Sequence, residues 1–167
     1  MTAALVGLTL LVPATSAHAR AASHLWATVN ICDTKSAENT LGVRARMPGN
    51  GSHQRMWMRF RVQYLSAQTS KWSYVRDGGL SPWIQAGSAR FAFKETGYEF
   101  SFDPPAAGTT FMLRGVVEFQ WRAKHHDKHG KIVETVAQRK RKFTEAGHRT
   151  KDADPAGFSA KSCEIKP

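Results

Sequence analysis

Between Arg55 and Leu65 two sets of side chains alternate, one apolar and the other polar except for Trp57, and this alternation constrains the fold more than any other feature of the chain. The apolar phase consists of Met56, Met58, Phe60, Val62 and Tyr64. The polar phase consists of Arg55, Trp57, Arg59, Arg61 and Gln63. Successive side chains of a β-strand point to opposite faces of its sheet, so the pattern predicts a strand with one face in a core and the other toward solvent.

The same period of two recurs along the chain, and no segment has helical periodicity. Further strands are expected at residues 24–32, 40–47, 72–76, 88–93, 98–102, 110–124, 131–143 and 158–165. In the longest of them, the inward phase runs from Phe111 to Trp121. Short strands at this spacing, separated by turns rich in glycine and proline, predict an all-β fold, an antiparallel β-sandwich of seven to nine strands.

The first nineteen residues have the composition of a secretory signal peptide. An uncharged apolar run at 3–12 leads into Pro13, and the small residues Ala17 and Ala19 suit a signal peptidase. The run is too short to span a bilayer. We therefore expect a secreted protein whose single domain covers residues 20–167 and contains no transmembrane segment. A buried N-terminal strand or helix is the alternative interpretation of this run.

The two cysteines, Cys32 and Cys163, are 131 positions apart, near the two ends of the expected domain. Neither has a second cysteine within a few residues, the spacing that zinc ligands and thiol redox motifs use. An exported protein meets an oxidising environment, so we expect the two to form a disulfide between the terminal strands. Closing so long a loop stabilises a fold by roughly 4 to 5 kcal/mol in the chain-entropy model.

The sequence from residue 111 contains FMLRGVVEFQWR, then a short polar turn and GKIV at 130–133. It resembles the penultimate hairpin of immunoglobulin-like and fibronectin type III-like modules in bacterial secreted proteins. The resemblance implies a β-sandwich that binds other molecules, and such modules share no active site. Two features depart from antibody domains: the expected disulfide joins terminal strands, and Trp57 falls in the outward phase of its strand.

The chain is strongly cationic. It contains 24 Lys and Arg against 13 Asp and Glu, a formal net charge of +11, and all of these residues follow Ala19. A surface with this charge attracts polyanions. The expected partner is therefore an anionic polymer, such as a cell-envelope polymer, a polysaccharide or a nucleic acid, or else a protein.

The first candidate binding site is a run of four cations: Arg139, Lys140, Arg141 and Lys142. Consecutive cations of this kind bind sulfated glycans, nucleic acids or anionic lipid headgroups. Arg114 is expected close by, opposite Lys140 in the neighbouring strand. The alternative is a charged sheet edge that keeps the protein soluble and deters pairing with other strands.

The position of this run depends on the pairing of strands 110–124 and 131–143. We expect a hairpin with Lys124 opposite Gly130. Continuing that register would bring Arg139 and Arg141 into the core, where unpaired charges are costly. We therefore expect the second strand to leave the core near Gln138 and to expose all four cations together.

The second candidate is the polar phase of the strand at 55–65, with Arg55, Trp57, Arg59 and Arg61. An exposed indole among guanidinium groups suits stacking on a sugar ring or a base next to an anionic group. In a sandwich this strand neighbours the strand at 110–124. Glu118 and Glu134 would then share the face and neutralise part of its charge. A loop or a partner covering Trp57 is the alternative.

A third cluster lies in the turn of the long hairpin, where His125, His126 and His129 surround Asp127. Imidazoles and a carboxylate are ligands for Zn, Ni or Cu. However, consecutive side chains in a tight turn point apart, so the three histidines are weak metal candidates. A solvated turn is the alternative.

Catalytic motifs are absent from the sequence: it has no GxSxG, HExxH, P-loop or glycine-rich dinucleotide turn. Asp152 and Asp154 form an acidic pair in an expected loop, without an evident partner. We therefore expect a non-catalytic binding or structural module with no cofactor. The alternatives are a hydrolase or metal-dependent enzyme that uses the histidine turn, and a self-associating structural subunit.

Overall fold

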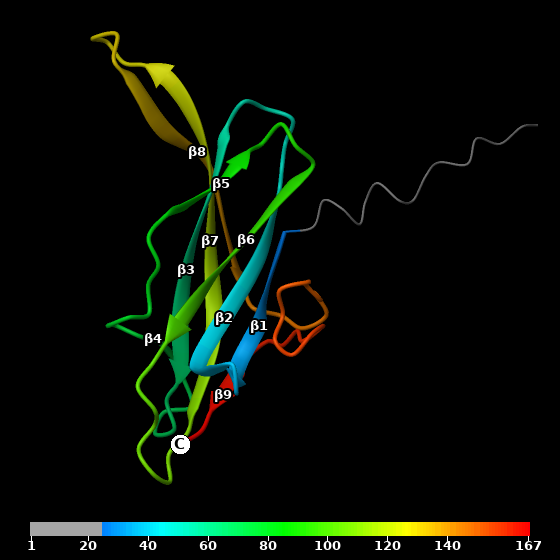
Figure 1. Ribbon diagram of the computed structural model, residues 1–167. Coiled ribbons are helices and arrows are strands. Elements are labelled where there is room, and N and C mark those ends of the chain that lie inside the picture. The colour runs from blue at the N-terminus through cyan, green and yellow to red at the C-terminus, as the bar shows by residue number, and fades with distance from the viewer. Residues whose placement is uncertain (1–24) are drawn as a thin grey trace, which may run out of the picture.

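The computed structural model describes residues 25–167, and the expected signal peptide lies outside them. This part of the chain contains nine strands and no helix (Figure 1). The strands are β1 (Trp26–Thr34), β2 (Ala37–Pro48), β3 (Arg55–Leu65), β4 (Trp72–Tyr74), β5 (Ile84–Ser88), β6 (Phe93–Ser101), β7 (Phe111–His126), β8 (Ile132–Phe143) and β9 (Cys163–Ile165). The all-β class predicted from the alternation is confirmed.

The strands form two sheets packed as a β-sandwich. The three-stranded sheet has the order β1-β2-β6, and the six-stranded sheet has the order β4-β3-β7-β8, with β5 paired to β3 and β9 to β7. All pairings between these strands are antiparallel. In Figure 1, β2 and β6 cross in front of β3 and β7, while the distal part of the β7–β8 hairpin projects beyond the sandwich.

The core lies between the two sheets and is filled by the predicted apolar phases. On β3, the exposed fraction of Met56, Met58, Phe60 and Val62 is 0%, and the inward residues of β2 are equally buried. The predicted phase fails at strand ends, where Tyr64 is 42% exposed and Phe111 38% exposed, and at Val116, which is buried although it lies in the outward phase of β7. Alternation therefore identified the buried faces of β2, β3 and β7, but β1 is buried on both faces and no residue of β8 is fully buried.

The strand predicted at 88–93 is wrong, because β5 ends at Ser88 and β6 begins at Phe93. The residues between them form a turn that the loop after β2 holds in place. Its Asn50 and Gly51 amides donate to the Ala89 carbonyl, and the Gly49 amide donates to Ala92. A Cβ on Gly49 would lie 1.8 Å from the Phe91 carbonyl oxygen, so only glycine permits this approach. The last predicted strand, at 158–165, is shortened to β9.

The predicted register of the β7–β8 hairpin is also wrong. Lys124 lies opposite Glu134, not Gly130. Asp127 sets the turn, since its Oδ1 accepts the amide protons of His129 and Lys131 at 2.8 and 2.9 Å. Residues 125 and 126 therefore belong to β7, and the two strands pair four positions further along β8 than expected.

A bulge between Trp121 and Arg122 shifts the β7–β8 pairing once more, and β8 then stays paired with β7 as far as Phe143. The strand therefore does not leave the sheet near Gln138, although residues 137–141 are exposed, as the expectation that it leaves the core requires. Lys140 and Lys142 follow in the inward phase, opposite Phe119 and Val117. They avoid deep burial because β8 is an edge strand: Lys140 is exposed and Lys142 half-buried.

The predicted disulfide between Cys32 and Cys163 is confirmed, with an S–S distance of 2.08 Å and a Cα–Cα distance of 5.3 Å. Cys32 lies in β1 of the three-stranded sheet and Cys163 in β9 of the six-stranded sheet. The bridge therefore joins terminal strands, as expected, and in doing so also links the two sheets.

Candidate functional site

The outer face of the six-stranded sheet, which points away from the three-stranded sheet, brings the first two candidate sites together. Its residues come from β3 (Arg55, Trp57, Arg59, Arg61, Gln63), β7 (Arg114, Val116, Glu118, Gln120, Arg122) and β8 (Glu134, Val136, Arg139, Arg141, Phe143). The register sets Arg59, Glu118 and Arg141 side by side across the three strands. Trp57, Gln120 and Arg139 form the next row.

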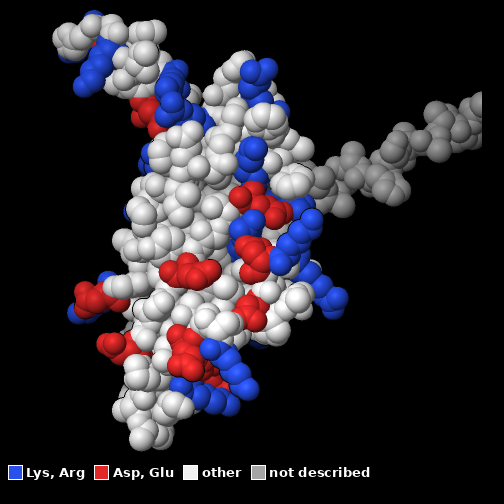
Figure 2. Space-filling model, in the orientation of Figure 1, with Lys and Arg blue, Asp and Glu red and all other residues white. Residues whose placement is uncertain are grey.

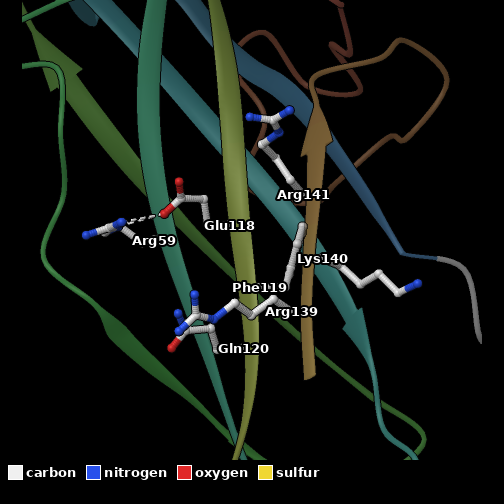
Figure 3. Close-up of a pocket in the computed structure, with 7 residues that line it drawn as sticks. All are labelled: Arg59, Glu118, Phe119, Gln120, Arg139, Lys140 and Arg141. Carbon is white, nitrogen blue, oxygen red and sulfur yellow. Dashed lines mark hydrogen bonds and ion pairs between the residues drawn. The ribbon is translucent and has the colours of Figure 1, made fainter. Parts of the chain in front are cut away.

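A groove of about 420 Å³ lies where these two rows meet (Figure 3). It is lined by Arg59, Glu118, Phe119, Gln120, Arg139, Lys140 and Arg141. Figure 3 shows the Arg139 and Arg141 side chains on the same side of the sheet as Glu118, and the Lys140 side chain directed the opposite way. The prediction of one exposed cluster of four cations is therefore wrong, since alternation divides them between the two faces of β8.

The arginines of β3 are ion-paired with the two carboxylates of the outer face. Arg59 donates from Nε and Nη2 to Glu118 Oε2 at 2.9 and 2.6 Å, and Arg61 Nη1 lies 3.6 Å from Glu118 Oε1. In the same way, Glu134 lies 3.7 Å from both Arg55 and Arg122. Each carboxylate therefore holds two guanidinium groups, as the sequence suggested for Glu118 and Glu134.

The paired arginines also stack on aromatic rings. The guanidinium carbon of Arg59 lies 4.6 Å from the ring centroid of Trp83, and that of Arg61 lies 3.8 Å from Tyr74. Arg122 lies over both Trp57, at 4.5 Å, and Trp83, at 4.9 Å. A guanidinium fixed by both a carboxylate and a ring has little freedom to bind a ligand.

Trp57 is not the exposed indole that the sequence predicted. Its side chain is half-buried under Arg122, and its buried Nε1 has no hydrogen-bond partner among residues 25–167. The interpretation in which Trp57 is covered is therefore the better one. The group that covers Trp57 is the guanidinium of Arg122, which belongs to the same outer face. Trp83, in the segment before β5, also contacts this guanidinium.

The cations of β8 differ from those of β3 because they have no carboxylate partner. Within residues 25–167, no Asp or Glu lies within ion-pair distance of Arg139, Lys140, Arg141 or Lys142. Arg141 lies opposite Glu118, but Arg59 and Arg61 already occupy both oxygens of that carboxylate. Arg139 and Arg141 are therefore exposed, uncompensated charges at the outer groove.

Arg114 lies away from Lys140, so its predicted position is wrong. It is opposite Gln63 and donates from Nε to the Gln63 side-chain oxygen at 2.9 Å. Desolvation by burial lowers the pKa of Arg114, while the charge of Tyr74 acts in the opposite direction. The group stays cationic at neutral pH, because a guanidinium does not deprotonate in that range.

The outer face of the three-stranded sheet shows the same pairing of charges as β3. Arg44 Nη1 lies 2.6 Å from Asp152, and Arg46 donates from Nε to Glu95 at 2.6 Å. Figure 2 shows acidic and basic groups next to each other on the face that it presents. The arginines of β2 and β3 are therefore ion-paired, whereas in the described chain the β8 run lacks carboxylate partners, as do Lys94, Arg114 and Lys124 on the neighbouring strands.

The structure does not gather the histidines of the turn into one cluster. His125 and His126 are consecutive on β7, so their side chains point to opposite faces, and Asp127 is engaged by the backbone of the turn. Within the part of the chain that the structure describes, no group of three His, Cys, Asp or Glu side chains is placed to hold a metal ion.

The acidic pair Asp152 and Asp154 has structural partners. Asp152 pairs with Arg44, and Asp154 accepts hydrogen bonds from Ser36 and, at 2.5 Å, from Thr34. The Ser36 and Thr34 hydroxyls lower the pKa of Asp154, against a smaller desolvation effect. Both carboxylates attach the loop before β9 to the three-stranded sheet.

Three aromatic residues near the candidate site, Trp72, Trp83 and Phe143, were not among the predicted site residues. Phe143 continues the phase of Arg139 and Arg141, so the strand pattern contains a signal for it. Trp72 and Trp83 reach the outer face from β4 and from the segment before β5. Only the fold places these two next to the arginines.

No helix within residues 25–167 has the length and apolar character needed to cross a membrane. No protein-family model matches the chain, and a search of curated proteins found no similar sequence.

Proposed function

We propose that the protein is a secreted, non-catalytic β-sandwich module that binds an anionic polymer through the outward cations of β8. The observation that carries the proposal is the contrast in pairing. Arg139 and Arg141 are exposed at a groove and have no carboxylate within ion-pair distance in the described chain, whereas the β3 arginines of the same face are ion-paired. A ligand that carries several negative charges would supply the missing partners.

The groove supports this binding in two further ways. Gln120 lies between Trp57 and Arg139, and since its side-chain oxygen accepts a hydrogen bond from Arg122 Nε at 2.8 Å, its NH₂ group is left to donate to a ligand. Glu118 would repel a polyanion, but Arg59 and Arg61 neutralise it. Guanidinium groups bind phosphate, sulfate or carboxylate groups through two parallel hydrogen bonds. A polymer also displaces counterions, so its affinity should fall steeply with salt.

Secretion is part of the proposal. It is supported by the apolar run at residues 3–12 with its small residues at 17 and 19, and by the disulfide, which persists in oxidising compartments. The alternative of a charged edge that only deters strand pairing would give the same exposure of Arg139 and Arg141. It would not predict specific retention on a polyanion.

We further propose that the domain is an immunoglobulin-like module. Its strand order supports this, since β1-β2-β6 and β3-β7-β8 occupy the places of strands A-B-E and C-F-G in immunoglobulin domains. The buried tryptophans differ in position: Trp26, 5% exposed, lies on β1 and Trp121, 3% exposed, on β7, whereas antibody domains carry theirs on the third strand.

The proposed function is tested by retention on an immobilised sulfated polysaccharide over a salt gradient. The variant Arg139→Gln/Arg141→Gln removes the two outward cations, and Lys140→Gln/Lys142→Gln removes the same charge from the other side of β8. We expect the first variant to elute at clearly lower salt than the second. Equal shifts would show that net charge alone governs retention, and a wild-type protein that is not retained would refute the proposal.

A further inference from the structure

An exposed aromatic ring continues the row of unpaired arginines. Phe143 lies two residues after Arg141 in the same phase of β8, and it is 41% exposed. The guanidinium carbons of Arg114 and Arg141 lie 4.4 and 5.6 Å from its ring centroid. On β4, which pairs with β3, the ring centroid of Trp72 lies 4.3 Å from the guanidinium carbon of the same Arg114.

These contacts define a stacking path across the outer face, in which guanidinium groups and rings follow one another: Arg141, Phe143, Arg114 and Trp72. Arg139 precedes Arg141 in the same phase of β8. Residues two apart on a strand are separated by about 6.6 Å, so neighbouring groups of the β8 part lie within reach of consecutive units of a polymer. A hollow of about 150 Å³ at the end of the path is lined by Trp72, Arg114 and Lys161, among others, and extends the cationic lining.

The path differs from a simple charged patch because it offers flat faces as well as charges. Sulfated and uronic polysaccharides carry the charge, but they have no planar π-system to extend a stack. A nucleic-acid duplex has planar bases, but their faces are hidden within the helix, and only the base edges line its grooves. Single strands expose both the phosphates and the faces of the bases.

We propose that the polymer is a single-stranded nucleic acid, whose phosphates pair with Arg139 and Arg141 and whose base stacks on the exposed part of Phe143. This inference rests on the proposed function, because the same two arginines carry the charge. Stacking of this kind tolerates any base, since every base has a π-face. The site is therefore expected to show little sequence preference and a strong dependence on salt.

The test compares three probes by fluorescence anisotropy and competition: a short labelled oligothymidylate, a duplex of the same length, and heparin. Phe143→Leu keeps an apolar side chain and removes the π-face, whereas Phe143→Trp keeps a ring. Phe111→Leu is the matched control, since Phe111 is 38% exposed, lies five positions before Val116, the partner of Phe143, and belongs to the opposite phase of β7.

We expect the wild-type protein to bind the single strand more tightly than the duplex. Phe143→Leu should weaken single-strand binding by at least about fivefold, the low end for one stacked base, and leave heparin binding unchanged. Phe143→Trp and Phe111→Leu should stay within about twofold of wild type. Thermal unfolding of each variant verifies that it is folded, and if Phe143→Leu is not, the preference of the wild-type protein for the single strand over the duplex carries the test.

Two results would overturn this inference, and they differ in whether the proposed function survives. If heparin, duplex and single strand bind equally and Phe143→Leu changes none of them, the nucleic-acid inference is wrong while polyanion binding by β8 survives. If Arg139→Gln/Arg141→Gln changes the binding of no probe, the proposed function fails, and this inference fails with it.

Discussion

β3 and β8 both place arginines at alternate positions on the same outer face, but the arginines of the two strands differ in their partners. β3 is a central strand, so its arginines have neighbours on both sides, and Glu118 and Glu134 hold two guanidinium groups each. β8 is an edge strand with one neighbour, and the carboxylate opposite Arg141 is already engaged. Two similar patterns of cations in the sequence therefore differ in their capacity to bind an anion, because the position of each strand in the sheet determines whether its cations have carboxylate partners.

The largest difference between the two strands should appear in stability. Phe60 on β3 is fully buried, so Phe60→Ala should lower the free energy of unfolding by about 3 to 5 kcal/mol through lost burial and a cavity. Thr135→Ala on the exposed part of β8 should change it by less than about 0.5 kcal/mol. Denaturant unfolding of both variants measures this, and comparable losses would mean that β8 contributes to the core.

Removing Glu118 should make β3 resemble β8. Glu118→Gln leaves Arg59 and Arg61 without a carboxylate, and because both side chains are partly exposed we expect a loss of only about 1 kcal/mol in stability. Retention on an anionic column should increase. Glu38→Gln removes the same charge from an exposed position that has no ion pair in the described chain. Equal retention of the two variants would argue against ion pairing as the reason why the β3 arginines do not bind the polymer.

The smallest expected effect is on the salt dependence of polymer binding. Arg139→Gln should reduce the slope of log affinity against log salt by roughly 0.7 to 0.9, as expected for one lost phosphate or sulfate contact. Arg55→Gln should leave the slope unchanged, because Arg55 is paired with Glu134. Titrations at several salt concentrations give both slopes. A change of slope for Arg55→Gln alone would place the binding surface on β3.

The bounds of β3 and its buried face could be predicted from sequence, because alternation is a local property of eleven consecutive residues. The register of β7 and β8 could not. It depends on the hydrogen bonds that Asp127 accepts in the turn and on a bulge after Trp121, neither of which leaves a periodic signal.

The candidate site was predictable in its residues and not in its arrangement. The β8 run and the β3 face were both identified, but only the register shows that Arg141 and Arg59 flank one carboxylate. The stacking of Arg59 and Arg122 on Trp83 depends on how the chain between β4 and β5 folds back over the sheet. Sequence patterns do not predict contacts between residues so far apart in the chain.

The bridge between Cys32 and Cys163 has a mechanical consequence. A pull on the chain before β1 and after β9 is carried across the S–S bond, because the two cysteines are joined close to the ends of the fold. Residues 33–162, which include nearly all of both sheets, then bear no tension. Only the first part of β1 and the last residues of the chain can be peeled away, so the sandwich is shielded from force until the disulfide is reduced.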